Sequence, residues 1–298
     1  MTLSNTVKGF SNRFVSATSF GLIPLFSIPV MNAGMDVPSM MVYRFGLGCV
    51  ALLLLLFVKH IPLGLTRREA AEVALLALFY DVEAMLMIFG YNYISSGIAT
   101  TLVFSYPIFT EVLMLIFFHE RFSWNTLVAL LLAFAGVALL TGFGGSEHAR
   151  TAGIMIELMA GLSYAFYIVA MSNMRVRRMN SFKLTFYIFG FSTLFFIIFG
   201  MGMNGGIKPV KDVPMFCNLL LLGLVSTALS NVLLIPAIKQ IGATTTAVLG
   251  AFEPLTAMII SITVFGDSFS LVMGIGFVLI IVSVIQLVLV NVKKKQSI

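Results

Sequence analysis

Ten apolar runs follow one another along the chain, and each is about as long as a membrane-spanning helix. An α-helix rises about 1.5 Å per residue, so about 20 apolar residues cross a hydrocarbon core of about 30 Å. The runs lack the strict alternation that is typical of membrane barrel strands. We therefore predict ten helices, over residues 10–31, 38–58, 70–90, 97–118, 124–142, 151–172, 183–203, 213–235, 243–265 and 270–291.

Short segments rich in Gly, Pro or charge separate these runs, as turn signals do. Examples are KHIPLGLTRRE after the second run, GFGGSEHAR after the fifth and RVRRMNSFK after the sixth. The first run contains Pro24 and Pro29, is too long for the core of a signal peptide and has no small-residue cleavage site. We interpret it as a true membrane span.

Composition agrees with this pattern. The chain is 59% hydrophobic and only 10% charged, and its mean hydropathy is +1.05. Soluble domains are about 45–50% apolar and about 25% charged, so a soluble globular protein is excluded. Disorder is excluded as well, because disordered chains are poor in apolar residues. The predicted fold class is an all-α membrane protein with ten transmembrane helices.

The basic residues are unevenly divided between the two sides of the predicted bundle. Of the 18 Lys and Arg residues, three lie in loops of one side, namely Arg150, Lys208 and Lys211, and Arg44 lies inside a span. The other side holds Lys8, Arg13, Lys59, Arg67, Arg68, Arg121, Arg175, Arg177, Arg178, Lys183, Lys239, Lys293, Lys294 and Lys295. Basic loops stay on the cytoplasmic side, so we expect a multi-pass protein of the cytoplasmic membrane with both termini in the cytoplasm.

The sequence repeats itself at an offset of 147 residues. ISSGIATTLVFSYPIFTEVLMLIFFHERFS around the fourth run aligns without a gap to IGATTTAVLGAFEPLTAMIISITVFGDSFS around the ninth. Pro107 falls on Pro254, and Glu120 falls on Asp267. The offset corresponds to five spans, an odd number, so the halves 1–145 and 146–298 should cross the membrane in opposite senses. Inverted repeats of this kind are typical of secondary transporters.

The small residues at the start of the repeated helix, its mid-helix proline and its acidic-x-Phe-Ser exit resemble the EamA-type repeat of the drug/metabolite transporter superfamily. The resemblance covers essentially the whole chain, although Asp267 stands where the pattern usually has Glu. It implies a secondary transporter or facilitator for small metabolites, such as amino acids or related compounds, and we expect an exporter. The alternatives left open are a membrane-embedded enzyme and a non-transporting membrane scaffold.

Away from the ends of the predicted spans, six ionisable residues lie inside them: Arg44, Asp81, Glu83, Glu111, Glu157 and Glu253. A charge at the bilayer centre costs at least about 2.5–3.5 kcal/mol, so each should face the bundle interior and find a partner. Arg44, Glu83 and Glu157 lie at similar depths. Arg44 could bind an anionic group of the substrate, but intramembrane charges usually pair with each other, so we favour a structural ion pair with Glu83.

Pro107 and Pro254 each interrupt a predicted helix near the midplane. Each removes one backbone donor, so the carbonyls of Val103 and Gly250 should lose their partners. A packing kink is one interpretation. We favour a cavity, because repeat-related broken helices are the best sequence indication of a transport site.

The predicted cavity has an aromatic and amide lining that suits a small amphipathic solute, and its candidate residues are Tyr80, Glu83, Tyr106, Asn231, Glu253 and Arg44. Glu253 is the candidate for proton coupling. Enzyme motifs are missing: HERFS resembles the start of a zinc-protease motif, but Ser123 stands in place of the second His. We therefore expect no enzyme activity, cofactor, metal or nucleic acid, and the expected partners are a small-molecule substrate and the lipid bilayer.

Overall fold

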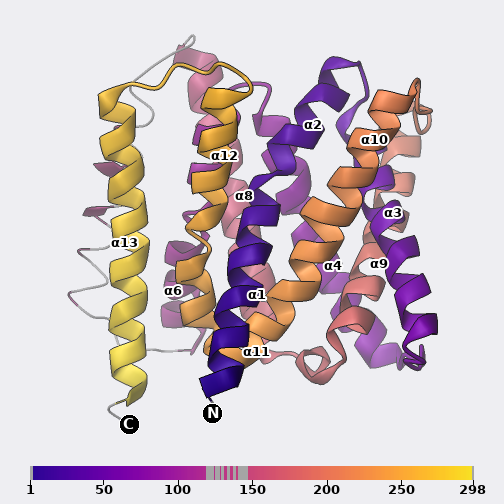
Figure 1. The fold of residues 1–298 in the computed structure, drawn as a ribbon, viewed down its shortest axis with the longest axis horizontal. Coiled ribbons are helices and arrows are strands. Elements are labelled where there is room, and N and C mark those ends of the chain that lie inside the picture. The colour runs from indigo at the N-terminus through magenta and orange to yellow at the C-terminus, as the bar shows by residue number, and fades with distance from the viewer. Residues whose placement is uncertain are drawn as a thin grey trace.

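The computed structural model describes residues 3–118 and 147–296, together with isolated positions between these two ranges, and this part of the chain is built of helices and turns without strands. The helices stand side by side as a bundle (Figure 1). The first range contains α1 (Leu3–Gly21), α2 (Ile23–Asn32), α3 (Val37–Val58), α4 (Arg67–Gly90), α5 (Ser96–Val103) and α6 (Tyr106–Phe118).

The second range contains a comparable series of helices. It consists of α8 (Glu147–Asn173), the 3₁₀-helix η1 (Arg175–Arg178), α9 (Ser181–Asn204), α10 (Val213–Leu221), the π-helix η2 (Leu222–Leu229), α11 (Ser230–Leu249), α12 (Phe252–Thr263) and α13 (Leu271–Gln296). Both chain ends lie at the same end of the bundle (Figure 1).

Seven helical segments of the described part are long and apolar enough to cross a membrane. They are Val7–Asn32, Val37–Val58, Arg67–Gly90, Ser96–Phe117, Thr151–Met171, Ser181–Gly202 and Val213–Ile241, and the shorter apolar helices are Phe252–Thr263 and Leu271–Ser283. The predicted span 124–142 lies outside the described residues. The protein is therefore a multi-pass membrane protein.

Local capping explains why several spans begin close to where the sequence predicts. The Asp36 side chain caps α3 by accepting a hydrogen bond from the backbone N–H of Ser39. Thr66 and Glu69 form a reciprocal capping box at the start of α4. Asn180 accepts from backbone N–H groups at the start of α9. Such caps satisfy the donors that the first turn of a helix leaves free.

The two repeat-related prolines lie at helix breaks, the interpretation that the sequence analysis favoured over a packing kink, although neither proline lies in the middle of a helix. α5 ends at Val103 and α6 begins at Tyr106, so Pro107 lies in the first turn of a new helix. Pro254 holds the same place in α12. A backbone N–H in the first turn of a helix has no intrahelical acceptor, so a proline, which lacks this N–H, breaks no hydrogen bond there. The Gly250 carbonyl is not left without a donor, because the N–H of Glu253 bonds to it at 2.8 Å.

The boundary between the predicted eighth and ninth spans was also placed wrongly. No loop separates residues 235 and 243, because α11 continues to Leu249 and the break follows at 250–251. The position of the break agrees to within one residue with the offset of 147 residues, which carries 104–105 onto 251–252. The local sequence IKQIGATTT looked like a turn because of its Lys, Gln and Gly.

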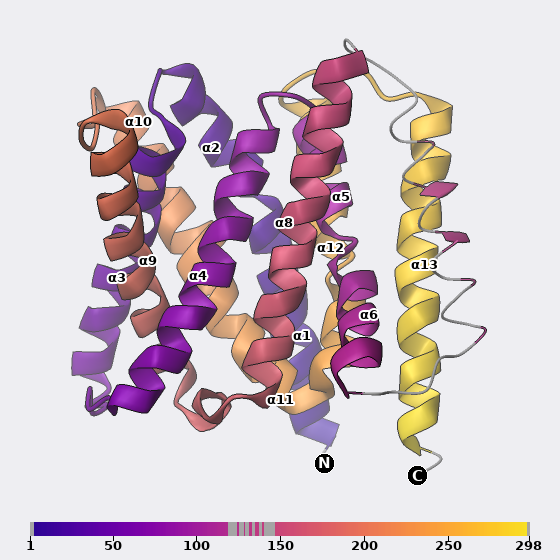
Figure 2. The same cartoon turned by 180° about the vertical axis from the view of Figure 1, so that it is seen from behind.

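The two series of helices interleave instead of forming separate bundles. α1 packs mainly on α11 and α12, while α8 packs mainly on α4, α5 and α6. α3 packs on α9, and α5 packs on α12. Figure 2 shows α8 between α4 and α6. The first helix of each series thus lies against the third and fourth spans of the other.

Loops fasten the ends of the α3–α9 pair across the two series. At one end, Lys208 Nζ forms an ion pair with Asp36 Oδ2 at 3.2 Å, and its backbone N–H donates to Ser39 Oγ at 2.9 Å. Lys211 Nζ donates to the carbonyl of Ala33 at 2.8 Å. We call this set of contacts the lysine latch.

At the opposite end of the α3–α9 pair, the described contacts are hydrogen bonds to backbone carbonyls and a cation–π contact between Lys59 and Phe182. Lys183 Nζ donates to the carbonyl of Gly64, and the Tyr187 hydroxyl donates to the carbonyl of Leu63. The lysine latch therefore differs from its counterpart in containing an ion pair. Partial burial raises the pKa of Asp36, but the hydrogen bonds from Ser39 and the charge of Lys208 outweigh it and hold the pKa below its ordinary value.

Candidate functional site

Arg13 is a buried, charged residue that the sequence analysis did not place in the interior. The charge count placed it in a cytoplasmic loop, but it lies in α1 with only 1% of its surface exposed. Its Nη2 contacts Glu253 Oε1 at 2.7 Å as a salt bridge, and its Nε donates to the carbonyl of Thr246 at 2.8 Å. Arg13 is thus an intramembrane cation with a direct anionic partner.

This arginine bridges the break between α11 and α12. Thr246 lies in the last turn before the break, and Glu253 lies in the first turn after it. A cation is favourable at a helix C-terminus and an anion is favourable at a helix N-terminus, because of the helix dipoles. Arg13 and Glu253 therefore stabilise both helix ends while neutralising each other.

The same guanidinium group also contacts a residue at the break between α5 and α6. Arg13 Nη2 also donates to the hydroxyl of Tyr106, the first residue of α6, at 3.4 Å. The ring of Tyr106 meets the ring of Tyr164 edge to face, with centroids 4.7 Å apart. The pseudo-equivalent residues Tyr106 and Glu253 therefore meet at Arg13, as the repeat suggested they would meet at one place.

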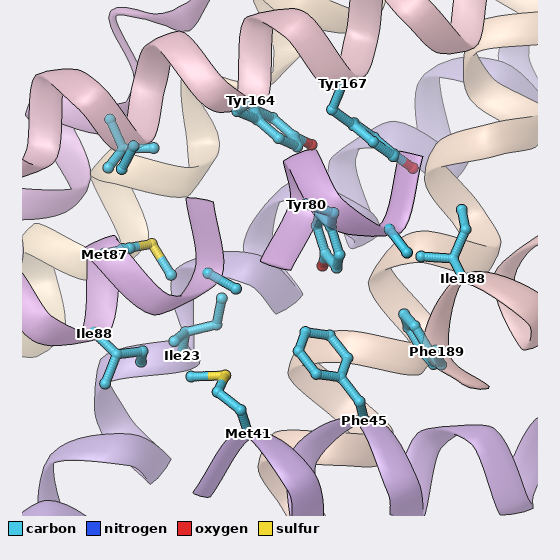
Figure 3. Packing of buried hydrophobic residues seen from close by; sticks show 14 of the residues in the cluster. Ile23, Met41, Phe45, Tyr80, Met87, Ile88, Tyr164, Tyr167, Ile188 and Phe189 are labelled. Carbon is cyan, nitrogen blue, oxygen red and sulfur yellow. The ribbon is translucent and has the colours of Figure 1, made fainter. Parts of the chain in front are cut away.

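A row of buried tyrosines continues from this point across the core. Tyr164 and Tyr167 lie three residues apart on one face of α8 and stack with centroids 5.6 Å apart. Tyr80 on α4 follows, 5.4 Å from Tyr167, and then Phe45 on α3, 5.8 Å from Tyr80. Figure 3 shows Tyr80 between this tyrosine pair and Phe45. We call Tyr106, Tyr164, Tyr167 and Tyr80 the tyrosine row.

The far end of the tyrosine row is bonded to the π-helix. Asn231 Nδ2 donates to the Tyr80 hydroxyl at 2.8 Å and to the carbonyl of Thr227 at 2.9 Å. Thr227 Oγ1 accepts from Arg44 Nε at 2.7 Å and donates to the carbonyl of Leu222, five residues earlier. π-Helical turns occur frequently at functional sites, because their wider ladder redirects side chains.

The expected ion pair between Arg44 and Glu83 is not formed, so that prediction was wrong. Besides Thr227, Arg44 reaches the Met41 sulfur at 3.9 Å, and its guanidinium lies 5.3 Å from the centre of the Phe45 ring. Arg44 lies close enough to Glu83 for its charge to act on the carboxyl group. Among the described residues, however, no carboxylate lies within 4 Å of Arg44.

The acids of the interior fall into two groups. Glu253 is paired with Arg13, whereas both carboxyl oxygens of Glu157 lack a hydrogen-bond partner in the described part, and Asp81, which lies near Ser192, is fully buried like Glu157. Glu83 and Glu111 are also buried.

One line of contacts therefore joins five of the six predicted cavity residues. It runs from Glu253 through Arg13 and the tyrosine row to Asn231, Thr227 and Arg44. Glu83 is buried beside this line without a hydrogen bond to it. The arrangement offers guanidinium donors, aromatic faces and an amide, which together suit a small solute that carries a carboxylate and an apolar part.

Sequence reasoning missed Arg13 and Thr227 and left the central tyrosines out of the candidates. Arg13 could have been recognised, because it interrupts the helical segment SNRFVSATSF without a second charge nearby. Tyr164 and Tyr167 show the helical spacing of one buried face. Thr227 gives no local signal, because its role depends on the π-helix. Among the described residues, no group of three or more His, Cys, Asp or Glu could hold a metal ion.

The fold is shared with a protein of known structure. That chain is 12% identical in sequence and superposes with a TM-score of 0.68, covering 97% of this chain and 98% of its own length. At this level of identity the likeness shows the fold alone.

Curated relatives span most of the chain. An uncharacterized transporter of Bacillus subtilis (strain 168) is 24% identical over 220 residues, covering 74% of this chain and 70% of its own length. An uncharacterized transporter of Archaeoglobus fulgidus is 26% identical over 278 residues, covering 91% of this chain and 93% of its own length. A third relative, the "Probable terminal-alkyne amino-acid exporter" of Streptantibioticus cattleyicolor, is 26% identical over 149 residues, covering 47% of this chain and 48% of its own length.

A protein-family comparison accounts for nearly the whole sequence. The EamA-like transporter family matches residues 8–142 and then matches again over residues 151–289. This finding confirms the resemblance drawn from the repeated proline-containing helices. With its buried polar line and its membrane-spanning helices, the chain belongs to the EamA-like transporter family.

Proposed function

We propose that this chain is a secondary transporter or facilitator that exports small metabolites, amino acids or related compounds, across the cytoplasmic membrane. The observation that carries the proposal is the buried line from Glu253 to Arg44, which passes both helix breaks in the core of the bundle. Amino-acid export is the activity in the name of the Streptantibioticus relative. The proposed activity involves no catalytic step.

The proposed architecture is ten transmembrane helices in two inverted repeats, 1–145 and 146–298, with both termini in the cytoplasm. Two matches of one family along the chain support the repeat. The interleaved packing supports inversion, because α1 relates to α11 and α12 as α8 relates to α4, α5 and α6. The position of both ends of the chain at the same end of the bundle supports an even number of spans (Figure 1).

Within this proposal, Arg44 binds the carboxylate of the substrate. Its guanidinium has five N–H donors, and its protein partners in the described part are a hydroxyl and a thioether. Arginine and carboxylate pair well through two parallel hydrogen bonds. Tyr80, Asn231, Tyr106, Glu83 and Glu253 then surround the rest of the solute. This assignment replaces the structural ion pair that the sequence favoured.

The test uses purified protein in proteoliposomes loaded with a panel of unlabelled amino acids and related acids and amines. Counterflow of the matching labelled solute reports binding and translocation. We expect carboxylate-bearing solutes to be exchanged, and we expect Arg44→Ala to abolish exchange while protein abundance stays normal. Arg68→Ala changes an exposed arginine of α4 and is the matched control.

Two results would overturn this assignment. Exchange of no solute in the panel by the wild-type protein would remove the proposed substrate class. Unchanged exchange by Arg44→Ala would remove the carboxylate-binding role of Arg44. Direction is tested in cells preloaded with the solute, where overproduction of the chain should accelerate its efflux.

A further inference from the structure

Glu157 is buried in a way that no structural role explains. It lies in α8 with 0% of its surface exposed, and neither carboxyl oxygen has a hydrogen-bond partner within the described part of the chain. Its Oε1 lies directly against the backbone of Gly90, so that a Cβ added there would be 2.0 Å from this oxygen. The carboxyl group therefore lies against the last turn of α4, in a space that only glycine leaves open.

The charges around Glu157 disfavour a carboxylate. The elements that pack most extensively against α8 are α4, α5, α6 and η1, and the turn that carries Tyr93 lies against Gly153 of α8. The like charge of Glu83 on α4 acts on Glu157, and the phenol of Tyr91 lies near it. α5 has no titratable side chain. The other titratable or charged groups on these elements are Arg67, Arg68, Glu69, Glu72, Tyr80 and Asp81 on α4, Tyr106 and Glu111 on α6, and Arg175, Arg177 and Arg178 on η1.

Three physical effects act in the same direction on this group. A buried carboxylate without a counterion is strongly unfavourable, and no cation lies within 4 Å of it among the described residues. Glu83 adds like-charge repulsion. Gly90 is the last residue of α4, and the C-terminus of a helix carries the negative end of its dipole. The neutral, protonated acid is therefore the form that fits this place.

Glu157 lies at a position that is suitable for proton transfer between one end of the bundle and the core. α8 begins at the end of the bundle away from the chain termini (Figure 2), and Glu157 lies six residues after Thr151, about 9 Å into the span. Glu83 lies seven residues before Gly90, about 10 Å further along α4 and one turn from Tyr80. The two acids thus form steps from one end of the bundle toward the tyrosine row.

We propose that Glu157 is a proton-binding site and that the transporter couples solute movement to release and uptake of this proton, with Glu83 as the inner step. The inference deepens the proposed function and rests on it for the coupling, but not for the bound proton. A purely structural role would be served at least as well by an apolar residue of similar size. Intramembrane acids typically mark proton pathways.

The proton itself is the probe in the first experiment. Infrared spectra of the purified full-length protein at neutral pH should show the carbonyl stretching band of a protonated carboxylic acid. Glu157→Gln should remove part of this band, and the part removed should titrate with alkaline pH in the wild type. Glu253→Gln is the matched control and should leave the band unchanged, because its carboxylate is paired with Arg13. A band that is unchanged in Glu157→Gln would overturn the proposal.

The second experiment separates coupling from transport. In proteoliposomes with an imposed pH gradient, the wild type should accumulate the solute against its concentration gradient. Glu157→Gln should lose this accumulation but retain counterflow when the pH is equal on both sides. Full gradient-driven accumulation by Glu157→Gln would overturn the coupling. Absence of counterflow in the wild type would instead contradict the proposed function, and the infrared result would still decide whether Glu157 binds a proton.

Discussion

Arg13 and Glu253 are 240 residues apart in sequence and 2.7 Å apart in space. Through this contact, the first helix of the chain holds the first turn of α12, which follows the break in the second repeat. The same guanidinium contacts the first residue of α6, which follows the break in the first repeat. One side chain therefore connects the helix breaks of the two repeats.

Loss of Arg13 should destabilise the protein strongly. Arg13→Ala leaves the Glu253 carboxylate buried without its cation, and breaking a buried pair in this way costs about 3–5 kcal/mol. The double variant Arg13→Met with Glu253→Gln removes both charges and should recover most of the loss. Thermal unfolding in detergent, monitored as the fraction of protein that stays monodisperse, measures the loss of stability in Arg13→Ala and its recovery in the double variant. A double variant no more stable than Arg13→Ala would show that the ion pair is not the source of the effect.

The hydroxyl of Tyr80 should matter more than that of Tyr167. Tyr80→Phe keeps the ring in the tyrosine row but removes the acceptor of the Asn231 amide, and leaving a buried donor without a partner costs about 1–3 kcal/mol. Tyr167→Phe is the matched control, since its hydroxyl has no hydrogen bond to a described residue. We expect solute exchange to fall in Tyr80→Phe alone. Equal effects of both changes would contradict a specific role for this hydrogen bond.

The lysine latch should contribute stability that depends on pH. The pKa of Asp36 is held below its ordinary value of 3.8 in the folded protein. The contribution of the ionised Asp36 to stability is therefore complete above pH 3.8 and is lost as the pH falls through the lower pKa of the folded state. Asp36→Asn retains a good helix cap but removes the ion pair with Lys208.

The unfolding temperatures of wild type and Asp36→Asn provide the measurement. At pH 7 the wild type should be the more stable by at most about 1 kcal/mol, because Lys208 is largely exposed. The difference should shrink as the pH falls below about 4. A difference that stays constant down to pH 3 would show that the charge of Asp36 is not responsible.

Two glycines in membrane-spanning helices should respond oppositely to the same change. In Gly90→Ala the new methyl group would meet the Glu157 carboxyl, so we expect lower stability, and we expect the double variant Gly90→Ala with Glu157→Ala to recover it. Gly202→Ala adds a methyl group where no atom lies within 4 Å. It should be neutral or stabilise by up to about 1 kcal/mol. A neutral Gly90→Ala would show that Glu157 can move away freely.

The sequence predicted the spans well where local signals set them. α3, α4 and α9 begin within about three residues of the predicted positions, because Asp36, Thr66 and Asn180 cap them. The turn expected before residue 243 is not formed, and α11 continues through this segment. Polar residues at a membrane surface do not by themselves end a helix.

Partners in the interior were harder to predict than spans. Arg44 and Glu83 were predicted to share a depth, but depth does not fix which faces of α3 and α4 meet, and Arg44 bonds to the π-helix instead. The same prediction for Glu157 was wrong, because Glu157 lies against Gly90, seven residues from Glu83 along α4. Arg13 was assigned to a loop by counting charges. Its partner lies in α12, at a separation that no local pattern can show. The repeat was the one long-range signal, and it pairs Tyr106 with Glu253, the two residues that Arg13 contacts.

The same repeat makes the Arg13 contact one-sided. At the offset of 147 residues, Ala160 stands where a second arginine would be, and Tyr106 stands where a second glutamate would be. Under the proposed inverted-repeat architecture, a conformation in which the two halves exchange roles could therefore not form an equivalent salt bridge. Under this proposal the Arg13–Glu253 salt bridge favours the conformation described here over the exchanged one, and each 1.4 kcal/mol of that difference changes the population ratio tenfold. A solute that drives the exchanged conformation must bind it more tightly by at least that difference.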